Sequence, residues 1–385
     1  MGINFEFATA SKIIFGNNSF EKVPDVILSS GKSVLLVTDK NIQRAEFLTE
    51  KIKQKNGRVV TFIVETEPTT DIIEEAIRLA RAENCNVVAG LGGGSVIDSA
   101  KAIAAMVPNK GSLFDFLEVI GLGKPLSEIP LPCIAIPTTA GTGAEVTKNS
   151  VIKSVKHKVK VSLRSDKMYP NVAVVDPVLT YTMPPSLTAS TGMDALTHLL
   201  ETFVSNQSNP FIDMICREGM RRISASLLVA FKNGNNFEAR EDMAMAGMLG
   251  GIALANVKLG AIHGLAGPMG GIYPIPHGEV CASLLAAVLE VNIKAVKKQN
   301  NSGLLEKFGE IARIFSGNVE ATAEDGIESI KNLVNQLNIP RLATFGLTSD
   351  NFPELIANAR NSSSMKGNPV VLSDDELYSV LEKSL

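Results

Sequence analysis

Residues 91–102 read LGGGSVIDSAKA, a glycine-rich run that follows an apolar segment and precedes a helical pattern. The apolar segment before it is typical of a buried parallel strand. Without side chains at Gly93 and Gly94, a pyrophosphate can approach backbone N–H groups at the positive end of the helix, where Ser95 can donate a further bond. The stretch predicts a strand, a turn and an anion-binding helix N-terminus, although a tight turn that only allows close helix packing is an alternative.

Strand and helix patterns alternate along the first 180 residues. Buried strands are predicted at 33–39, 58–64, 86–91, 132–137 and 172–177, and helices at 45–56 and 70–83. Such alternation is typical of a parallel, doubly wound sheet.

Residues 155–163 show strict alternation instead, with apolar residues on one side and polar residues on the other. The polar side carries Lys156, Lys158 and Lys160. This pattern predicts a strand with one solvated face. We expect His157, within this lysine-rich stretch, to be solvated.

From about residue 184 the patterns become almost entirely helical. Helices are predicted at 304–315, 324–337 and 374–385, and a small-residue helix at 243–265 that Pro268 ends or kinks. A chain of 385 residues exceeds what one hydrophobic core usually serves. We therefore expect an α/β domain over 1–180 and a helical domain over 181–385.

Composition excludes several classes of partner. Thirty-seven basic against 40 acidic residues give a net charge of -3, which offers no basic surface for nucleic acid or an anionic membrane. The first residues lack a signal-peptide pattern, and no apolar run approaches the length of a spanning helix. The four cysteines are scattered without metal-site spacing, which predicts buried thiols in a soluble, cytoplasmic protein.

Four residues in the second half are candidate metal ligands: Asp194, His198, His263 and His277. Asp194 and His198 are four residues apart in a helical segment, so both project from one face and can share a cation. One carboxylate and three imidazoles suit Fe(II) or Zn(II) with an open position for a substrate oxygen. Structural histidines remain the alternative, because spacing alone does not show that the four converge.

Asp39 is the candidate ribose ligand of a dinucleotide. It ends the strand predicted at 33–39 and would lie at the same carboxyl edge of the sheet as the glycine run. A carboxylate there accepts hydrogen bonds from both ribose hydroxyls and repels a 2′-phosphate. The position therefore favours NAD over NADP.

Several long, ordered motifs resemble those of the iron-containing (group III) alcohol dehydrogenases. They are GGGSVIDSAKAIA at 92–104, PTTAGTGAEVT at 137–147, GMDALTHLLE at 192–201, LGAIHG at 259–264 and PIPHG at 274–278. The resemblance covers nearly the whole chain. It implies an N-terminal Rossmann-like α/β domain with a parallel sheet and an all-α C-terminal domain, the fold shared with dehydroquinate synthase, with nicotinamide and metal meeting in the cleft. It also implies a homodimer or larger homo-oligomer.

The resemblance implies roles for individual residues. Asp194, His198, His263 and His277 would hold one divalent metal, with Fe(II) favoured over Zn(II), and would form the catalytic centre. The implied cofactor contacts are Asp39, Gly93, Gly94, Ser95, Asp98, Thr138, Thr139, Thr142, Asn149, Lys160 and Leu179.

Two positions depart from the family's pattern. Relatives often carry a second histidine four residues after the one at His263, but this chain has Gly267 there. Many relatives also place an asparagine near the cofactor where this chain has Glu67. If that histidine relays a proton in relatives, this protein uses water, a substrate group or another side chain, or favours a different substrate.

The implied activity is the NAD(P)-dependent, metal-assisted, reversible interconversion of an alcohol with its aldehyde or ketone. A metal-independent reductase resembling maleylacetate reductase is an alternative that Gly267 keeps open. A lyase resembling dehydroquinate synthase would need a basic pocket, and no dense basic cluster occurs between Asp194 and His277. A non-catalytic NAD-binding regulator is a further alternative.

Overall fold

The computed structural model describes residues 4–157 and 159–385, which separate into two compact units. Residues 8–139 and 143–181 form the α/β unit, and residues 4–7, 140–142 and 182–385 form the helical unit. The boundary predicted at residue 180 placed residues 4–7 and 140–142 in the α/β domain, but both segments belong to the helical unit. Phe5 and Phe7 explain the first, because their rings lie 5.8 and 4.8 Å from the ring of Phe211.

The α/β unit contains a six-stranded parallel sheet in the order β1-β8-β5-β4-β2-β3. Its strands are β1 (Ile13–Phe15), β2 (Ser33–Thr38), β3 (Arg58–Ile63), β4 (Val87–Gly92), β5 (Cys133–Pro137) and β8 (Val172–Val175). The five strands predicted at 33–39, 58–64, 86–91, 132–137 and 172–177 form within two residues of their predicted ends. The edge strand β1 was not predicted, because three residues are too few to show a period.

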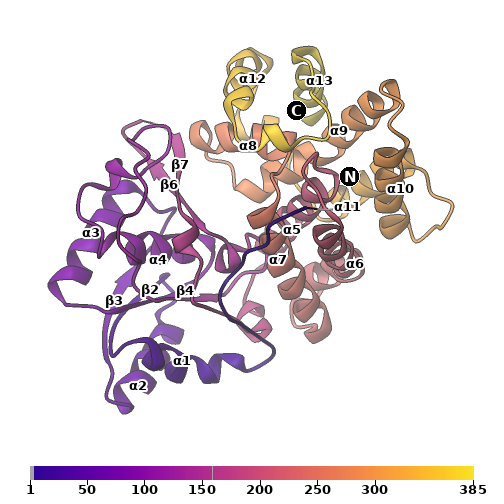
Figure 1. The fold of residues 1–385 in the computed structure, drawn as a ribbon. Coiled ribbons are helices and arrows are strands. Elements are labelled where there is room, and N and C mark those ends of the chain that lie inside the picture. The colour runs from indigo at the N-terminus through magenta and orange to yellow at the C-terminus, as the bar shows by residue number, and fades with distance from the viewer. Residues whose placement is uncertain (1–3, 158) are drawn as a thin grey trace. The chain divides into compact units, whose positions relative to one another are not determined.

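Helices cover both faces of this sheet. They are α1 (Val23–Ser30), α2 (Ile42–Gln54), α3 (Thr70–Ala82) and α4 (Gly94–Met106). Leu35 and Val37 of β2 pack in one core with α3 and α4, whereas Val34 and Leu36 pack in a second core with α1 and α2. Figure 1 shows the two helix pairs on opposite faces. The doubly wound sheet is therefore confirmed, and alternate side chains of each strand serve different layers.

A separate antiparallel hairpin follows the sheet's fifth strand. It consists of β6 (Asn149–Ser154) and β7 (Val159–Arg164). The strand predicted over 155–163 is wrong in its first part, because Ser154 pairs with Val159 and residues 155–157 form a turn. Exposed His157 lies in that turn, with its Nδ1 2.9 Å from the Ser154 hydroxyl. Lys158 lies outside the described residues.

The helical unit is built around α5, whose side chains are buried over most of its length. Its helices are α5 (Pro185–Val204), α6 (Pro210–Lys232), α7 (Phe237–Asn256), α8 (Ala261–Ile272), α9 (His277–Lys298), α10 (Ser302–Ser316), α11 (Ala323–Gln336), α12 (Phe352–Asn361) and α13 (Asp374–Ser384). Met193, Leu196 and Phe203 of α5 are fully buried in one apolar core with the surrounding helices. Among the described helices, none alone has the length and apolarity to cross a membrane, although α7 and α8, with a bend at the break between them, pass that test together by length and composition.

The helix predicted over 243–265 is wrong. The chain forms α7 and α8 instead, with axes bent by 98° at a short break. Gly260 ends the break, and a Cβ added there would lie 2.8 Å from Oε1 of Glu201. His263 therefore lies in the first turn of α8 rather than near the end of a long helix, and Pro268 lies inside α8.

Gly247 of α7 allows the closest approach of a helix to the segment 140–142. A Cβ at this position would lie 2.8 Å from the backbone nitrogen of Gly141 and 3.1 Å from the carbonyl carbon of Ala140. Backbone atoms cannot move aside as a flexible side chain can. Gly247 therefore places this segment against α7.

We expect Gly247→Ala to lower the free energy of unfolding by about 1–3 kcal/mol, because the added methyl overlaps backbone atoms. Gly303→Ala is the matched control, since exposed Gly303 has open space around it in α10. That change should raise stability by up to about 1 kcal/mol. Chemical unfolding followed by circular dichroism measures both, and equal effects of the two substitutions would contradict this account.

Candidate metal centre and cofactor-binding edge

The four predicted metal ligands converge within the helical unit. Asp194 and His198 lie on α5, His263 on α8 and His277 on α9. Oδ1 of Asp194 lies 3.6 Å from Nε2 of His198, 3.6 Å from Nε2 of His263 and 3.7 Å from Nε2 of His277. A metal with bonds of ~2.1 Å places its ligand atoms ~3.4–3.6 Å apart in a tetrahedral arrangement. These three distances fit a shared cation, and the donor atoms of Asp194, His263 and His277 also lie within 4.8 Å of one another.

Asp194 carries the strongest sign that a cation belongs at this point. Its side chain is 5% exposed, and Oδ1 has no hydrogen-bond partner within residues 4–157 and 159–385. Burial alone would raise the pKa of Asp194, but its interactions with His198, His263 and His277 outweigh burial and hold this pKa well below its ordinary value. A buried, unpaired carboxylate oxygen is costly. A bound cation would remove that cost.

His198 is held in the form that binds a metal. Burial lowers its pKa to about 4, although Asp194 acts in the opposite direction. The imidazole is therefore neutral at pH 7 and keeps a lone pair for a metal. Its ring stacks on the ring of His263, with centroids 4.8 Å apart and planes at 21°.

Glu201 orients His263. Its buried Oε2 lies 2.7 Å from Nδ1 of His263, and its Oε1 accepts a 2.7 Å hydrogen bond from the backbone N–H of Ile262. A carboxylate can only accept, so Nδ1 carries the proton and Nε2 is left free to bind a metal. Asn368 accepts from the N–H of Ala261. Glu201 and Asn368 thus accept hydrogen bonds from backbone N–H groups in the first turn of α8, the turn that carries His263.

Cys281 of α9 also faces this cluster. Its Sγ lies 3.8 Å from Nε2 of His263 and 3.7 Å from Nε2 of His277. Burial alone would raise the pKa of the Cys281 thiol, but the charges of His277 and His263 hold it below its ordinary value. The cysteine prediction was correct on burial, since all four are buried and free, but it gave Cys281 no part in the site.

The sequence analysis did not single out Glu201 or Cys281. Their helical spacing from the predicted metal ligands could have identified both. Glu201 follows Asp194 by seven residues and His198 by three, so all three lie on one face of α5. Cys281 follows His277 by four residues on α9 in the same way.

Gly267 lies one turn after His263 on α8. A Cβ added there would meet no atom of the described residues within 4 Å. The position that carries a histidine in the family's pattern is therefore open here, and a lack of space does not account for the glycine.

The predicted dinucleotide ligands gather at the carboxyl edge of the sheet in the α/β unit. The chain goes from β2 outward to β3 and then returns to β4 on the other side of β2, so the direction of winding reverses there. Asp39 directly follows β2, Gly93 follows β4, and Thr138 and Thr139 follow β5. Ligands of doubly wound sheets bind at such a reversal.

The glycine turn is shaped for close approach. A Cβ on Gly92 would lie 2.6 Å from the side chain of Val96, and one on Gly93 would lie 3.4 Å from the side chain of Thr139. Helix α4 begins at Gly94, so the N–H groups of Gly94 and the following Ser95 lie in its first turn. These residues fit a phosphate group of a dinucleotide.

Asp98 and Asn149 connect α4 to the hairpin. Oδ2 of Asp98 accepts from the N–H of Val151 at 3.0 Å, and its Oδ1 lies 3.0 Å from Nζ of buried Lys101. Lys101 also donates to the carbonyl of Asn149. Both predicted cofactor contacts thus take part in the packing of the α/β unit.

Three further predicted contacts lie elsewhere. Lys160 of β7 forms an ion pair with Glu67, the residue that departs from the family's pattern. Leu179, in a short 3-10 helix (Pro177–Thr180), is buried in the core under α1 and α2. Thr142 belongs to the helical unit.

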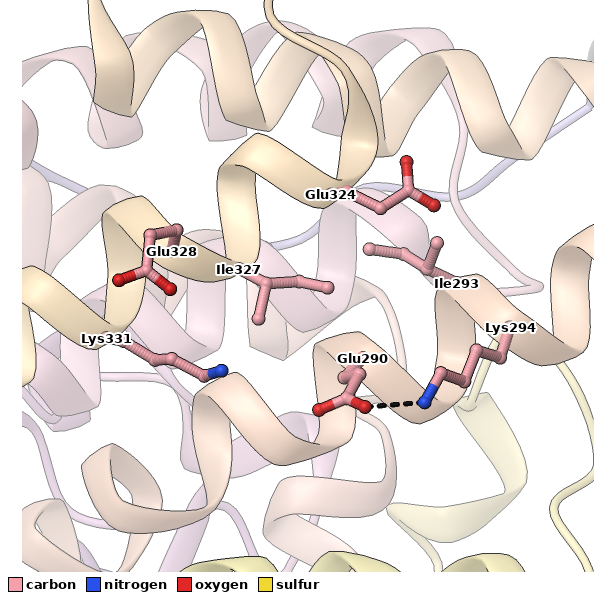
Figure 2. A pocket seen from close by; sticks show the side chains of 7 residues that line it. All are labelled: Glu290, Ile293, Lys294, Glu324, Ile327, Glu328 and Lys331. Carbon is pink, nitrogen blue, oxygen red and sulfur yellow. Dashed lines mark hydrogen bonds and ion pairs between the residues drawn. The ribbon is translucent and has the colours of Figure 1, made fainter.

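A surface pocket of about 330 Å³ lies between α9 and α11, away from these residues. Figure 2 shows that charged side chains line it, with Glu290 paired to Lys294 across 2.6 Å. It contains none of the predicted site residues. Three glutamates and two lysines line it, and Glu290 is held by ion pairs with Lys294 and Lys383, so nothing connects this pocket with the predicted site.

Comparison with known families matches both units. A family model described as iron-containing alcohol dehydrogenase matches residues 10–177. A second, described as the C-terminal part of the Fe-containing alcohol dehydrogenase family, matches residues 188–385.

Individual relatives match over nearly their full length. Alcohol dehydrogenase 4 of Saccharomyces cerevisiae (strain YJM789) is 34% identical over 96% of this chain and 96% of its own. The NAD-dependent methanol dehydrogenase of Bacillus methanolicus is 32% identical over 99% of this chain and 100% of its own. The crystal structure of a 1,3-propanediol oxidoreductase superposes with a TM-score of 0.91 at 31% identity, covering 100% of both chains.

We expect Glu201→Gln to weaken metal binding by about 10–100-fold. The amide that replaces Oε2 is a donor, so Nδ1 of His263 must accept and Nε2 must carry the proton, which removes the lone pair that faces Asp194. Chelator competition measures the metal dissociation constant. Glu290→Gln, in the surface pocket, is the control, and an equal affinity of the two variants would show that Glu201 does not orient the ligand.

Proposed function

We propose that this chain, which belongs to the iron-containing alcohol dehydrogenase family, interconverts small primary or secondary alcohols with their aldehydes or ketones at the cluster around Asp194. Membership of the family makes the protein a metal-dependent alcohol oxidoreductase. The observation that carries the site assignment is the approach of three imidazole nitrogens to within 3.6–3.7 Å of Oδ1 of Asp194, a buried oxygen without a hydrogen-bond partner in the described chain.

The residues of the cluster have separate tasks. Asp194, His198, His263 and His277 would hold the divalent metal, for which Fe(II) is the family's metal. When bound, the metal supplies a Lewis acid for the substrate oxygen, and NAD supplies a hydride acceptor. Glu201 keeps Nε2 of His263 aimed at the metal position, and the half-buried His277 leaves one side of the cluster open to a small molecule.

The proton released by the alcohol needs a route that does not use a side chain at position 267. Gly267 has no titratable group, and the space around it is open. Water can occupy such a space, so we propose that the proton leaves through water on this side of α8.

The α/β unit would bind the cofactor through its carboxyl edge. Gly93, Gly94 and Ser95 would contact the pyrophosphate, and Asp39 would accept from the ribose hydroxyls. NAD is the proposed cofactor, because Asp39 repels a 2′-phosphate and a relative is named as NAD-dependent. Asp39 also attracts Arg44, a cation that could otherwise pair with such a phosphate.

The alternatives receive no support from the comparisons. A metal-independent reductase would not need three imidazole nitrogens around one buried carboxylate oxygen. Free, buried cysteines support a cytoplasmic location, where thiols stay reduced. The proposed homodimer or larger assembly rests on the family resemblance.

Asp194→Asn tests the metal-dependent reaction. The amide has no charge to balance the metal, so we expect bound metal to be lost and kcat/KM to fall on the order of 10³-fold, while NADH still binds. Elemental analysis, NADH fluorescence and an NADH absorbance assay on a panel of short alcohols measure the three effects. Asp375→Asn, at an exposed position of α13, is the control. Full turnover by verified metal-free Asp194→Asn protein would favour the metal-independent reductase.

Asp39→Ser tests the cofactor preference. Removal of the carboxylate takes away both the ribose acceptor and the repulsion of a 2′-phosphate, and it leaves Arg44 in place. We expect the ratio of kcat/KM for NADP to that for NAD to rise about tenfold or more. Asp25→Ser, an exposed change on α1, should leave this ratio unaltered. A constant ratio in both variants would show that Asp39 does not contact the ribose.

A further inference from the structure

Glu67 lies where the hairpin of β6 and β7 meets the carboxyl edge of the sheet. It belongs to the loop between β3 and α3. This loop starts beside the end of β2, because the N–H of Val64 donates to the carbonyl of Thr38 at 2.8 Å. The hairpin is attached to the same loop, since the N–H of Lys153 donates to the carbonyl of Pro68 at 2.8 Å.

The carboxylate of Glu67 interacts with two lysines of the hairpin. Lys153 and Lys160 stand directly opposite each other on β6 and β7. One oxygen of Glu67, Oε1, forms an ion pair with Nζ of Lys160, and the other, Oε2, lies 3.8 Å from Nζ of Lys153. Like charges that face each other across antiparallel strands repel. Glu67 reduces this repulsion and cancels one of the two positive charges.

Lys160 is the more buried of the two lysines. Its side chain is 15% exposed, compared with 38% for Lys153 and 48% for Glu67. Water and salt therefore screen an anion near Lys160 less than one near Lys153. The family resemblance implies that Lys160 contacts the cofactor, whose pyrophosphate is negative. Glu67 and the cofactor would thus compete for the charge of one ammonium group.

A purely structural role for Glu67 is the competing explanation. In that case its carboxylate would hold the hairpin in place, and its loss would weaken cofactor binding. However, main-chain groups attach the hairpin at two other points. The N–H of Lys153 bonds to Pro68, and the N–H of Val151 donates to Oδ2 of Asp98 at 3.0 Å. The position of the hairpin therefore does not depend on Glu67.

We propose that Glu67 weakens the binding of NAD(H) by pairing with Lys160, and so sets the affinity for the cofactor. The inference rests on the proposed function, in which this edge of the sheet binds NAD. Without cofactor, Lys160 is held by Glu67. A bound dinucleotide is attracted by a cation that Glu67 already neutralises in part. Weaker binding of this kind appears mainly as faster release of the cofactor.

Fluorescence titration of the whole chain with NADH tests the proposal. Glu67→Gln keeps the size of the side chain and removes its charge. We expect the NADH dissociation constant at low salt to fall about three- to tenfold, and the KM for NAD to fall with it, while kcat does not rise. In about 0.5 M salt the gain should shrink to about twofold or less, because the ions screen Lys160. A structural role predicts weaker binding instead.

Two further variants show whether the effect passes through Lys160. Glu65→Gln is the matched control, because it removes the same charge from an exposed position of the same loop, and it should change the dissociation constant by about twofold or less. In a Lys160→Met background, Glu67→Gln should give no gain, since the paired cation is absent. Glu67→Asn replaces Glu67→Gln if circular dichroism shows that the latter misfolds.

The outcomes separate this proposal from the one it rests on. NADH binding by Glu67→Gln that equals or falls below that of the wild-type protein overturns the role of Glu67 and leaves the proposed activity intact. An equal gain in Glu65→Gln, or a gain that persists in the Lys160→Met background, also overturns it. Failure of the wild-type protein to bind NADH overturns both proposals.

Discussion

One buried oxygen constrains the helical unit more than any other atom. Oδ1 of Asp194 has no hydrogen-bond partner in the described chain, and three imidazoles surround it. An arrangement of this kind is stable when a cation completes it. It also requires α5, α8 and α9 to meet at one point, and the 98° bend after α7 is what turns the first residues of α8 toward α5. Glu201 joins the two helices there, since it binds both the end of α8 and His263.

In the α/β unit, the positions of the strand ends bring the candidate cofactor contacts together. Its strands are all parallel, so their carboxyl ends share an edge, and the reversal of winding beside β2 keeps that edge clear of crossing helices. Asp39 and Gly93 reach it because each follows directly on a strand end. The candidate cofactor contacts at this edge are mostly backbone groups and one carboxylate, whereas the candidate metal ligands of the helical unit are side chains.

The strands of the sheet were predicted well because the apolar pattern of each strand matches the burial of its side chains. The glycine turn, Asp39 and the four metal-ligand candidates likewise occur in restrictive local patterns. The break between α7 and α8 was not predictable in this way, because a distant side chain, Glu201, stabilises the new helix end. The spacing of His277 and Cys281 on α9 is a local pattern, but the approach of Cys281 to His263 depends on the meeting of α8 and α9.

The division of the chain between its units has a consequence for biosynthesis. The chain passes from one unit to the other after residues 7, 139, 142 and 181. A ribosome therefore delivers nearly all of the α/β unit before α5 exists, and that unit can begin to fold first. The aromatic arm at Phe5 and Phe7 and the segment 140–142 must wait for α6 and α7. Until then, the two aromatic side chains and the segment 140–142 lack the helices on which they pack.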